Sequence, residues 1–407
     1  MMELSPELKE FIRTHALEDT NKLLLSSKRY PDIDIPFAVD QILARRQVRE
    51  KLPDWFANEE IIYPSRLSTE QCSSELTGHY KQTLVKGQSC CDLTGGLGVD
   101  SYFLSGKVEQ MTYVERFPQY CDAARHNFKV LGINNIKIIC ADMREIIEDL
   151  HADTFYIDPA RRADCNKRVF ALTDCEPDII QLKPILLDRA QRLIVKISPM
   201  ADLEETLRLL PETQEIHVVA VKNECKEILF ILEGDSPRSD FHTVRIHAVN
   251  LHEYTDNRQS FNFTLAEEKE APLQTATTIG HYLYEPHAAI LKCGAFKLTA
   301  IRYEANKLHR HSHLYTSSVL RQDFPGRHFI VEDVMPFSGK LLKQIEKQIP
   351  QANITVRNFP LTVAEIRKRS RVKEGGDIYL FATTLADEQK VIIKTKKGNY
   401  IRINLDK

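Results

Sequence analysis

The chain has 407 residues, of which 43% are hydrophobic and 28% are charged, a composition typical of globular proteins. It contains no run of about 18 apolar residues, and its first residues include acids, which argues against a membrane span and against a signal peptide. The nine cysteines show no paired spacing, which argues against a disulfide framework and against a metal site. We therefore expect a cytoplasmic protein of two or three domains that holds no metal ion.

Charge is unevenly distributed along the chain. The net charge is −2, yet residues 236–407 contain 26 Lys and Arg against 18 Asp and Glu, so this part carries +8 and the rest carries −10. The asymmetry predicts an acidic catalytic body with a basic C-terminal module that binds a polyanion. The alternative is that the two parts simply attract each other.

The first 84 residues have the pattern of helices. Ser5 and Pro6 form a typical helix start, and Leu8, Phe11 and Ile12 recur after them at helical spacing. Comparable spacing recurs in two later segments before residue 84. We expect an N-terminal helical region over residues 1–84.

Apolar runs then alternate with helical segments over residues 85–235, which predicts an α/β fold with a Rossmann-like parallel sheet. The last two apolar runs are joined by the short link KNECK, residues 222–226. A link this short makes a hairpin, so the last strand must run antiparallel to the others. A Pro/Ser/Asp-rich linker leads into residues 236–407, where mixed strands and helices predict an α+β domain.

The stretch CCDLTGGLGVDS, residues 90–101, follows the first predicted strand. The dinucleotide fingerprint G-x-G-x-x-G fits it only in part, because Ser101 stands at the third glycine position. Residues 92–98 resemble the D/E-x-G-x-G-x-G loop of class I S-adenosylmethionine-dependent methyltransferases, with Thr94 at the first glycine position. The resemblance implies that the glycines let the backbone approach this cofactor, and that Asp92 holds its methionyl ammonium, usually through ordered water.

Further landmarks follow at the ends of the next predicted strands. Glu115 can accept both hydroxyls of a ribose, a feature that also suits NAD enzymes. The methyltransferase resemblance implies that Asp142 contacts the adenine amino group and that Met143 packs on the adenine. The antiparallel last strand is typical of methyltransferases and unusual in NAD-binding domains. The residues expected to bind S-adenosylmethionine are Asp92, Thr94, Gly95, Gly96, Gly98, Glu115, Arg116, Asp142 and Met143.

The motif IDPARR, residues 157–162, ends the fourth predicted strand and resembles motif IV of methyltransferases, the D/N-P-P type. Much of the catalysis of methyl transfer is alignment, and we expect Asp158, Pro159 and Arg161 to provide it. Asp158 can accept a hydrogen bond from an exocyclic amino group, helped by the Pro159 carbonyl. Arg162 is expected to bind a phosphate or a base of the substrate, the alternative being an ion pair with a nearby acid.

The motif also resembles the D-P-P-R of RNA uracil-C5 methyltransferases, which require a cysteine nucleophile. The corresponding segment here is VKISP, residues 195–199, which offers Ser198 and no cysteine. A serine hydroxyl is far less ionised than a thiol and does not readily form the covalent adduct. We therefore expect the methyl acceptor to be a nitrogen or a ribose oxygen.

The motifs taken together resemble a bacterial family of methyltransferases that carry a THUMP-like C-terminal domain. The segments concerned are DLTGGLGVDS, IDPARR, KISP, ECKEILF, YLYEP and GGDIYLFAT, and the resemblance covers roughly residues 65–407. THUMP domains of related enzymes bind RNA, usually tRNA. The resemblance therefore implies a methyltransferase that acts on structured RNA.

Two groups of residues outside the motifs are candidates for substrate binding. Thr77, Tyr80 and Lys81 lie on one face of a predicted helix before the first strand, where segments commonly cover the cofactor. Arg367, Lys368 and Arg369 form a basic cluster that suits phosphate contacts. The alternative for both groups is a solvated helix face.

The overall prediction is an S-adenosylmethionine-dependent methyltransferase that modifies tRNA or rRNA. Two alternatives remain open. The first is an enzyme of the same fold that acts on a protein or a small molecule. The second is a non-catalytic RNA-binding protein.

Overall fold

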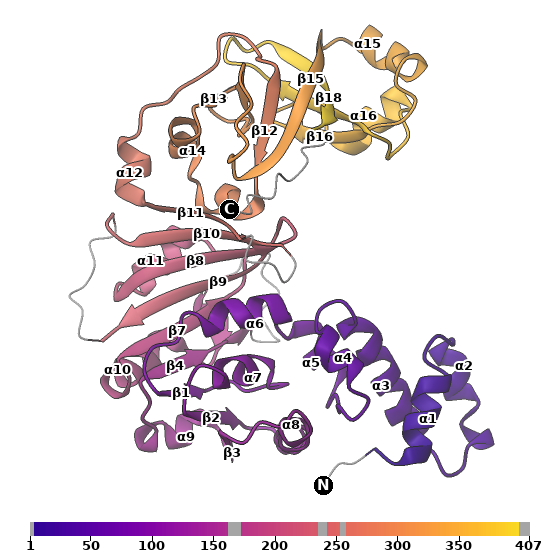
Figure 1. Ribbon diagram of the computed structural model, residues 1–407, viewed down its shortest axis with the longest axis vertical. Coiled ribbons are helices and arrows are strands. Elements are labelled where there is room, and N and C mark those ends of the chain that lie inside the picture. Colours follow the sequence, from indigo (N-terminus) through magenta and orange to yellow (C-terminus); the bar gives the residue numbers. More distant parts are fainter. Residues whose placement is uncertain (1–3, 162–171, 235–241, 253–257, 399–407) are drawn as a thin grey trace, which may run out of the picture. The chain divides into compact units, whose positions relative to one another are not determined.

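The computed structural model describes the chain except for residues 1–3, 162–171, 235–241, 253–257 and 399–407. It divides into two compact units (Figure 1). The first comprises Met1–Val221, Lys226–Val244 and Leu251–Asp256, and the second comprises Lys222–Cys225, Arg245–Asn250 and Asn257–Lys407. The predicted helical region and the predicted sheet domain thus belong to one unit. Among the described residues, no helix combines the length and hydropathy needed to cross a membrane.

Short helices precede the sheet of the first unit: α1 (Pro6–Thr14), α2 (Thr20–Leu25), η1 (Ser27–Arg29), α3 (Ile35–Val48), α4 (Pro53–Ala57), α5 (Arg66–Gln71) and α6 (Glu75–Gln82). The hydroxyl of Ser5 caps α1 by accepting the N–H of Leu8 at 3.2 Å. The buried Trp55 of α4 meets the ring of Tyr102 edge-on at 5.7 Å and shares a hydrophobic cluster with Leu97 and Phe103. The helical region therefore packs directly on the segment that contains the glycine loop.

The sheet of the first unit contains β1 (Ser89–Asp92), β2 (Gln110–Glu115), β3 (Ile136–Cys140), β4 (Thr154–Ile157), β7 (Arg192–Ile197), β8 (Thr213–Val221) and β9 (Glu224–Glu233). Their order is β8-β9-β7-β4-β1-β2-β3. β3, β2, β1, β4 and β7 pair in parallel, whereas β9 pairs with β7 in antiparallel register. The predicted Rossmann-like sheet with an antiparallel last strand is confirmed.

Further helices connect these strands: α7 (Val99–Ser105), α8 (Pro118–Val130), α9 (Met143–Ile146), η2 (Ile147–Asp149), η3 (Leu172–Asp174), α10 (Ile179–Arg189) and α11 (Leu203–Leu209). A small antiparallel pair, β5 (Ala160–Arg161) and β6 (Cys175–Glu176), lies between β4 and α10 in sequence. Because all the parallel strands end at the same edge, the loops after β1, β2, β4 and β7 gather there.

The second unit is an α+β structure, as predicted. Its elements begin with the antiparallel pair β10 (Arg245–Leu251) and β11 (Gln259–Thr264), followed by α12 (Leu265–Glu270). A seven-stranded sheet follows in the order β13-β14-β12-β15-β18-β17-β16, in which β16 and β17 are parallel. The strands are β12 (Tyr282–Pro286), β13 (Asn306–Lys307), β14 (Tyr315–Ser317), β15 (Gly326–Pro336), β16 (Asn353–Arg357), β17 (Ile378–Thr384) and β18 (Lys390–Lys397). Its helices are α13 (Ala288–Cys293), α14 (Phe296–Arg302), α15 (Gly339–Gln344), η4 (Ile345–Lys347) and α16 (Val363–Ser370).

Candidate functional site

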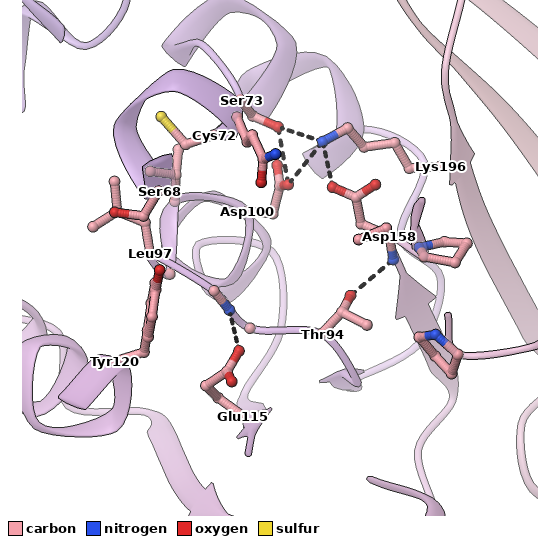
Figure 2. A pocket seen from close by; sticks show the side chains of 18 of the residues that line it. Ser68, Cys72, Ser73, Thr94, Leu97, Asp100, Glu115, Tyr120, Asp158 and Lys196 are labelled. Carbon is pink, nitrogen blue, oxygen red and sulfur yellow. Dashed lines mark hydrogen bonds and ion pairs between the residues drawn. The ribbon is translucent and has the colours of Figure 1, made fainter. Parts of the chain in front are cut away.

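A cavity of about 630 Å³ lies in the first unit at the carboxyl ends of the parallel strands (Figure 2). Its walls come from α5 and the segment after it, from the glycine loop, and from the residues that follow β2, β3, β4 and β7. This is the edge at which open α/β sheets bind their ligands. The volume falls in the range of about 300–1,000 Å³ that is usual for small-molecule and cofactor sites.

The glycine loop after β1 contains positions where a side chain would not fit. A Cβ on Gly95 would lie 2.2 Å from the ring of Tyr113, and one on Gly98 would lie 2.8 Å from the ring of Phe128. Gly96 has a φ of 53°, in the left-handed region that glycine adopts at little cost. A Cβ on Gly96 would meet nothing nearer than the Thr94 carbonyl at 3.8 Å. The cavity side of Gly96 is therefore open.

Both positions at which this loop departs from the expected patterns have a structural role. Thr94 Oγ1 accepts the backbone N–H of Asp158 at 2.8 Å and so ties the loop to the end of β4 (Figure 2). Ser101 Oγ donates to Asp92 Oδ2 at 2.6 Å, and Asp92 Oδ1 accepts the N–H of Thr94 at 3.0 Å. Burial raises the pKa of Asp92 to about 7, against the opposing effect of these hydrogen bonds. Asp92 is 1% exposed and lies outside the set of described residues that line the cavity.

Glu115, at the end of β2, lines the cavity and is held by two backbone amides. Its Oε2 accepts the N–H of Gly96 at 2.9 Å (Figure 2), and its Oε1 accepts the N–H of Phe117 at 2.9 Å. Each oxygen retains a lone pair for a further donor. The neighbouring Arg116 also lines the cavity, and its guanidinium lies 3.1 Å from a carboxylate oxygen of Glu176.

Asp142 caps the start of α9, and both of its carboxylate oxygens accept hydrogen bonds from the guanidinium of Arg144. These side-chain hydrogen bonds lower the pKa of Asp142, with burial opposing them. Of the described residues here, Met143 and Arg144 line the cavity and Asp142 does not. The contact of Asp142 with an adenine amino group stays a prediction, for a carboxylate that Arg144 already binds and whose neighbour Met143 lines the cavity.

Lys196 of β7 is a site residue that the sequence patterns did not indicate. Its Nζ donates to Oδ2 of Asp158 at 2.6 Å, and lies 3.5 Å from Oγ of Ser73 and 3.9 Å from Oδ2 of Asp100 (Figure 2). Burial opposes the charge of Lys196, but the carboxylates of Asp158, Asp100 and Glu227 outweigh burial and raise its pKa above the usual value. Its place within KISP, on a central strand beside motif IV, is the sequence signal that could have identified it.

A second lysine, Lys81, is buried near the cavity but does not line it. Lys81 of α6 is completely buried, and its Nζ lies 2.8 Å from Glu227 and 2.9 Å from Asp100. Burial opposes the charge of Asp100, but Lys81 and Lys196 outweigh it and lower the pKa of Asp100 to about 2. Burial raises the pKa of Glu227, and Lys81 offsets part of this effect. We call these five residues the lysine–carboxylate cluster: Lys81, Lys196, Asp100, Asp158 and Glu227.

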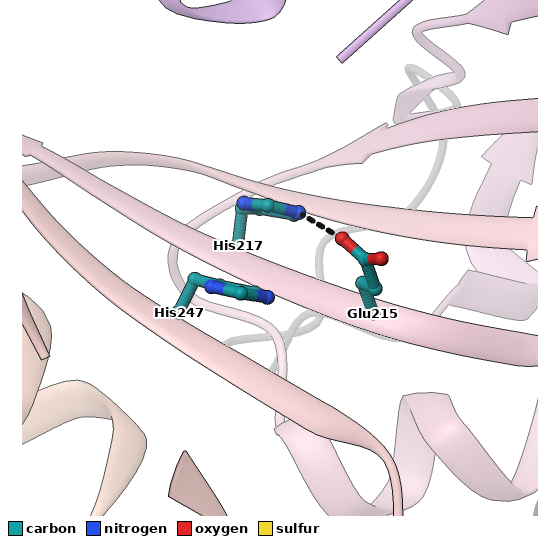
Figure 3. Close-up of side chains that lie close together, drawn as sticks. All are labelled: Glu215, His217 and His247. Carbon is teal, nitrogen blue, oxygen red and sulfur yellow. Dashed lines mark hydrogen bonds and ion pairs between the residues drawn. The ribbon is translucent and has the colours of Figure 1, made fainter. Parts of the chain in front are cut away.

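The burial of α6 argues against the substrate contacts that the sequence predicted for it. Thr77, Tyr80 and Lys81 are buried, because α6 packs against α7 and β8, and none of them lines the cavity. The hydroxyl of Tyr80 bonds Nδ1 of His217 at 2.7 Å, and Nε2 of His217 lies 3.3 Å from Glu215, its neighbour on β8 (Figure 3). Thr77 takes part in the capping box that starts α6. The polar groups of this helix face are therefore engaged inside the protein.

Motif IV is described in part. Asp158 and Pro159 line the cavity. The backbone of Arg161 pairs with Cys175 between β5 and β6. Arg162, for which we expected a substrate contact, lies outside the described residues.

The basic residues of α16 are in the second unit and differ among themselves. Arg367 is half-buried, and its guanidinium donates to the carbonyls of Val372 and Ala352, so it stabilises the end of the helix. Lys368 and Arg369 are exposed. Of the three residues predicted to bind substrate on α16, Lys368 and Arg369 therefore present their charge to solvent.

Comparison with known proteins gives a close relative. The crystal structure of a "putative methyltransferase" from Porphyromonas gingivalis W83 is similar, with 40% sequence identity, a TM-score of 0.87, and coverage of 97% of this chain and 98% of that chain. Two family models match the second unit: a ferredoxin-like domain over residues 282–325 and a THUMP-like domain over residues 326–396. None of the curated proteins matches the chain.

More distant structures also match. An rRNA methylase from Streptococcus thermophilus has 16% identity and a TM-score of 0.30, with coverage of 39% of this chain and 94% of that chain. A methyltransferase of Agrobacterium tumefaciens, described as SAM-dependent, has 17% identity and a TM-score of 0.30, with coverage of 40% and 60%. Similarity at this level supports no inference about the substrate of this chain.

Proposed function

The chain belongs to the family of the Porphyromonas gingivalis protein, and from this premise we propose that it transfers a methyl group from S-adenosylmethionine to structured RNA. We further propose that the acceptor is a nitrogen or a ribose oxygen. The observation that carries the proposal is the cavity itself, because one hollow is lined by the glycine loop, by Glu115 and by Asp158. These residues come from three neighbouring strand ends of a sheet that has the methyltransferase topology.

The residues present fit the cofactor. Glu115 is fixed by two amides, and its remaining lone pairs can accept the two hydroxyls of a ribose. The open side of Gly96 lets a ligand approach the backbone of the loop, which a side chain would prevent. Met143 is buried in the cavity wall and can pack on an adenine. When bound, the cofactor supplies a methyl group activated on a sulfonium sulfur.

The second unit supports the choice of RNA as substrate. Residues 326–396 match a THUMP-like domain. This resemblance implies RNA binding, because THUMP domains of related enzymes bind RNA. The C-terminal 172 residues carry a net charge of +8, and Lys368 and Arg369 are exposed on α16. Exposed cations of this kind bind phosphates without reading sequence.

Calorimetry with S-adenosylmethionine tests the cofactor site. We expect the purified protein to bind it, and Glu115→Gln to weaken binding by about 10- to 100-fold, because hydrogen bonds to a charged group contribute about 1.5–3 kcal/mol. Glu109→Gln is the matched control, since Glu109 is exposed just before the opposite end of the same strand. Wild-type protein that does not bind the cofactor, or a Glu115→Gln variant that binds normally, would contradict the assignment.

Titration with bulk tRNA at increasing salt tests the RNA assignment. Phosphate contacts release counterions, so affinity should fall steeply as salt rises. Affinity that does not respond to salt would exclude RNA, and would leave a protein or a small molecule as the acceptor. Methyl incorporation into RNA, abolished in Asp158→Ala while RNA binding persists, separates an enzyme from a binding protein.

A further inference from the structure

The end of the cavity beside motif IV presents an ammonium and a carboxylate together. Lys196 Nζ and Asp158 Oδ2 are 2.6 Å apart, and both residues line the cavity. The side chain of Asp158 is 37% exposed, and that of Lys196 is 12% exposed. Among the described residues, Oδ1 of Asp158 has no hydrogen-bond partner, so it is available to a group in the cavity. A ligand at this end therefore meets one donor and one acceptor side by side.

The hydrogen-bonding capacity of the acceptor atom decides which chemistry fits this pair. A hydroxyl has one O–H and two lone pairs. It can donate its proton to Asp158, accept a hydrogen bond from Lys196 with one lone pair, and keep the second lone pair for the methyl carbon. All three requirements of the reaction are then met at once.

A nitrogen acceptor does not match the pair in the same way. A ring nitrogen or an exocyclic amino nitrogen of a base has at most one lone pair, which must point at the methyl carbon. A hydrogen bond from the ammonium of Lys196 would compete for that lone pair. An amino group of a base needs hydrogen-bond acceptors around it. Here the acceptor Asp158 lies next to the ammonium of Lys196, which is a donor.

The cluster behind the cavity keeps Lys196 in its charged form. Asp100 lies 3.9 Å from Lys196 Nζ, and Glu227 adds a further negative charge. Lys81 balances these carboxylates from the interior, because it is bonded to both. The raised pKa of Lys196 means that its role is to donate a hydrogen bond, and the proton must go to a carboxylate.

We propose that the methyl acceptor is the 2′-hydroxyl of a ribose in RNA, held between Lys196 and Asp158. This inference rests on the proposed function and deepens it. The hydroxyl oxygen forms a bond to the methyl carbon as the carbon–sulfur bond breaks, and the electron pair of that bond stays on sulfur. The hydroxyl proton passes to Oδ1 of Asp158. The site loses one positive and one negative charge together, so its net charge does not change.

The position of a second cation agrees with a ribose in the nucleic-acid backbone. Lys226 is exposed on β9 and lines the same cavity. Every ribose within an RNA strand is flanked by phosphates, and a lysine in the lining of the same cavity can bind one of them.

The products of an RNA methylation reaction test the proposal directly. RNA from a strain that lacks the protein is incubated with purified protein and methyl-labelled S-adenosylmethionine, and is then hydrolysed with alkali. Alkali cleaves RNA through the free 2′-hydroxyl, so 2′-O-methylation leaves the label in alkali-resistant dinucleotides. Label in mononucleotides would overturn the ribose assignment and leave the methyltransferase assignment intact. Absence of label, from protein that binds the cofactor, would overturn both, and label in protein would do the same.

Variants test the two residues assigned to the hydroxyl. Lys196→Met and Asp158→Asn should each lower the rate of 2′-O-methylation at saturating substrate by about 100-fold or more, as for other groups that take part in proton transfer. Lys196→Arg keeps the charge and should recover part of the rate. Affinity for S-adenosylmethionine, measured by calorimetry, should change by less than a few-fold in all three variants, which also shows that they fold.

The matched control is Lys86→Met. Lys86 forms an ion pair with Glu233 at 2.7 Å just before β1, on the amino side of that strand and outside the cavity lining. We expect this variant to methylate RNA at the wild-type rate. A Lys196→Met variant that binds cofactor and methylates as fast as Lys86→Met would overturn the proposal.

Discussion

The lysine–carboxylate cluster of the first unit and the basic helix α16 of the second contain the same kinds of cationic side chain in opposite surroundings. Lys81 has no exposed surface and contacts two carboxylates at 2.8 and 2.9 Å. Lys368 and Arg369 are exposed to solvent on α16. An ammonium group inside a protein must be paired, because the loss of its hydration costs several kcal/mol. An exposed cation keeps its hydration and can exchange it for contact with a phosphate.

This difference separates two roles that the amino-acid types alone do not distinguish. A buried lysine contributes to stability and to the position of its partners, and its removal exposes their unbalanced charges to a medium of low dielectric. An exposed lysine contributes little to stability, and its removal mainly lowers the affinity for a negatively charged binding partner. The following predictions test this contrast, beginning with the largest expected effect.

Lys81→Met should lower the free energy of unfolding by about 3–5 kcal/mol, because it leaves Asp100 and Glu227 without their shared ammonium partner. Urea denaturation measures the change. Lys86→Met removes a lysine that is 59% exposed, and it should cost less than about 1 kcal/mol. Equal losses of unfolding free energy in the two variants would show that burial does not determine how much these lysines contribute to stability.

The affinity for S-adenosylmethionine should depend on pH through Asp92. Asp92 does not line the cavity, but it is bonded to Thr94 of the loop that does, and burial raises its pKa to about 7. The positive charge of a cofactor held by that loop favours the ionised form of Asp92. Binding must therefore displace a proton below pH 7, and affinity should fall by up to about tenfold per pH unit as pH decreases from 7 to 5.5. Asp92→Asn should bind more weakly and without this pH dependence. Calorimetry between pH 7 and 5.5 measures the affinity of both proteins for S-adenosylmethionine. A wild-type affinity that does not change with pH would contradict the role of Asp92.

The double variant Lys368→Ala/Arg369→Ala should leave stability unchanged within about 0.5 kcal/mol, because both side chains are exposed. Its affinity for tRNA should decrease, and the slope of log affinity against log salt should become shallower by about 1 for each phosphate that the variant no longer binds. Lys340→Ala/Lys343→Ala on α15 removes two exposed charges from the same unit and serves as the control. Equal effects of the two pairs would show that α16 is not the RNA-binding element.

The predictions from sequence succeeded where the determining interactions are local. The hairpin link at residues 222–226 requires an antiparallel last strand whatever the rest of the fold, and β9 pairs accordingly with β7. Thr94 and Ser101 are the positions at which the loop departs from the two motifs that it resembles. Their hydroxyls bond the backbone of Asp158 and the side chain of Asp92, interactions that the local sequence does not reveal.

The sequence by itself determined the order of the elements, the glycine loop and the carboxylates at the strand ends, because periodicity, chain reversals and glycine depend on neighbouring residues. Only the tertiary structure decided which charged residues meet. Lys81 and Glu227 are 146 residues apart, and the order of the strands brings them together. The same packing buries the face of α6 that sequence reasoning assigned to the substrate, and it places Lys196 beside Asp158. Pairing and burial depend on residues that are distant in the chain, so no local pattern could specify them.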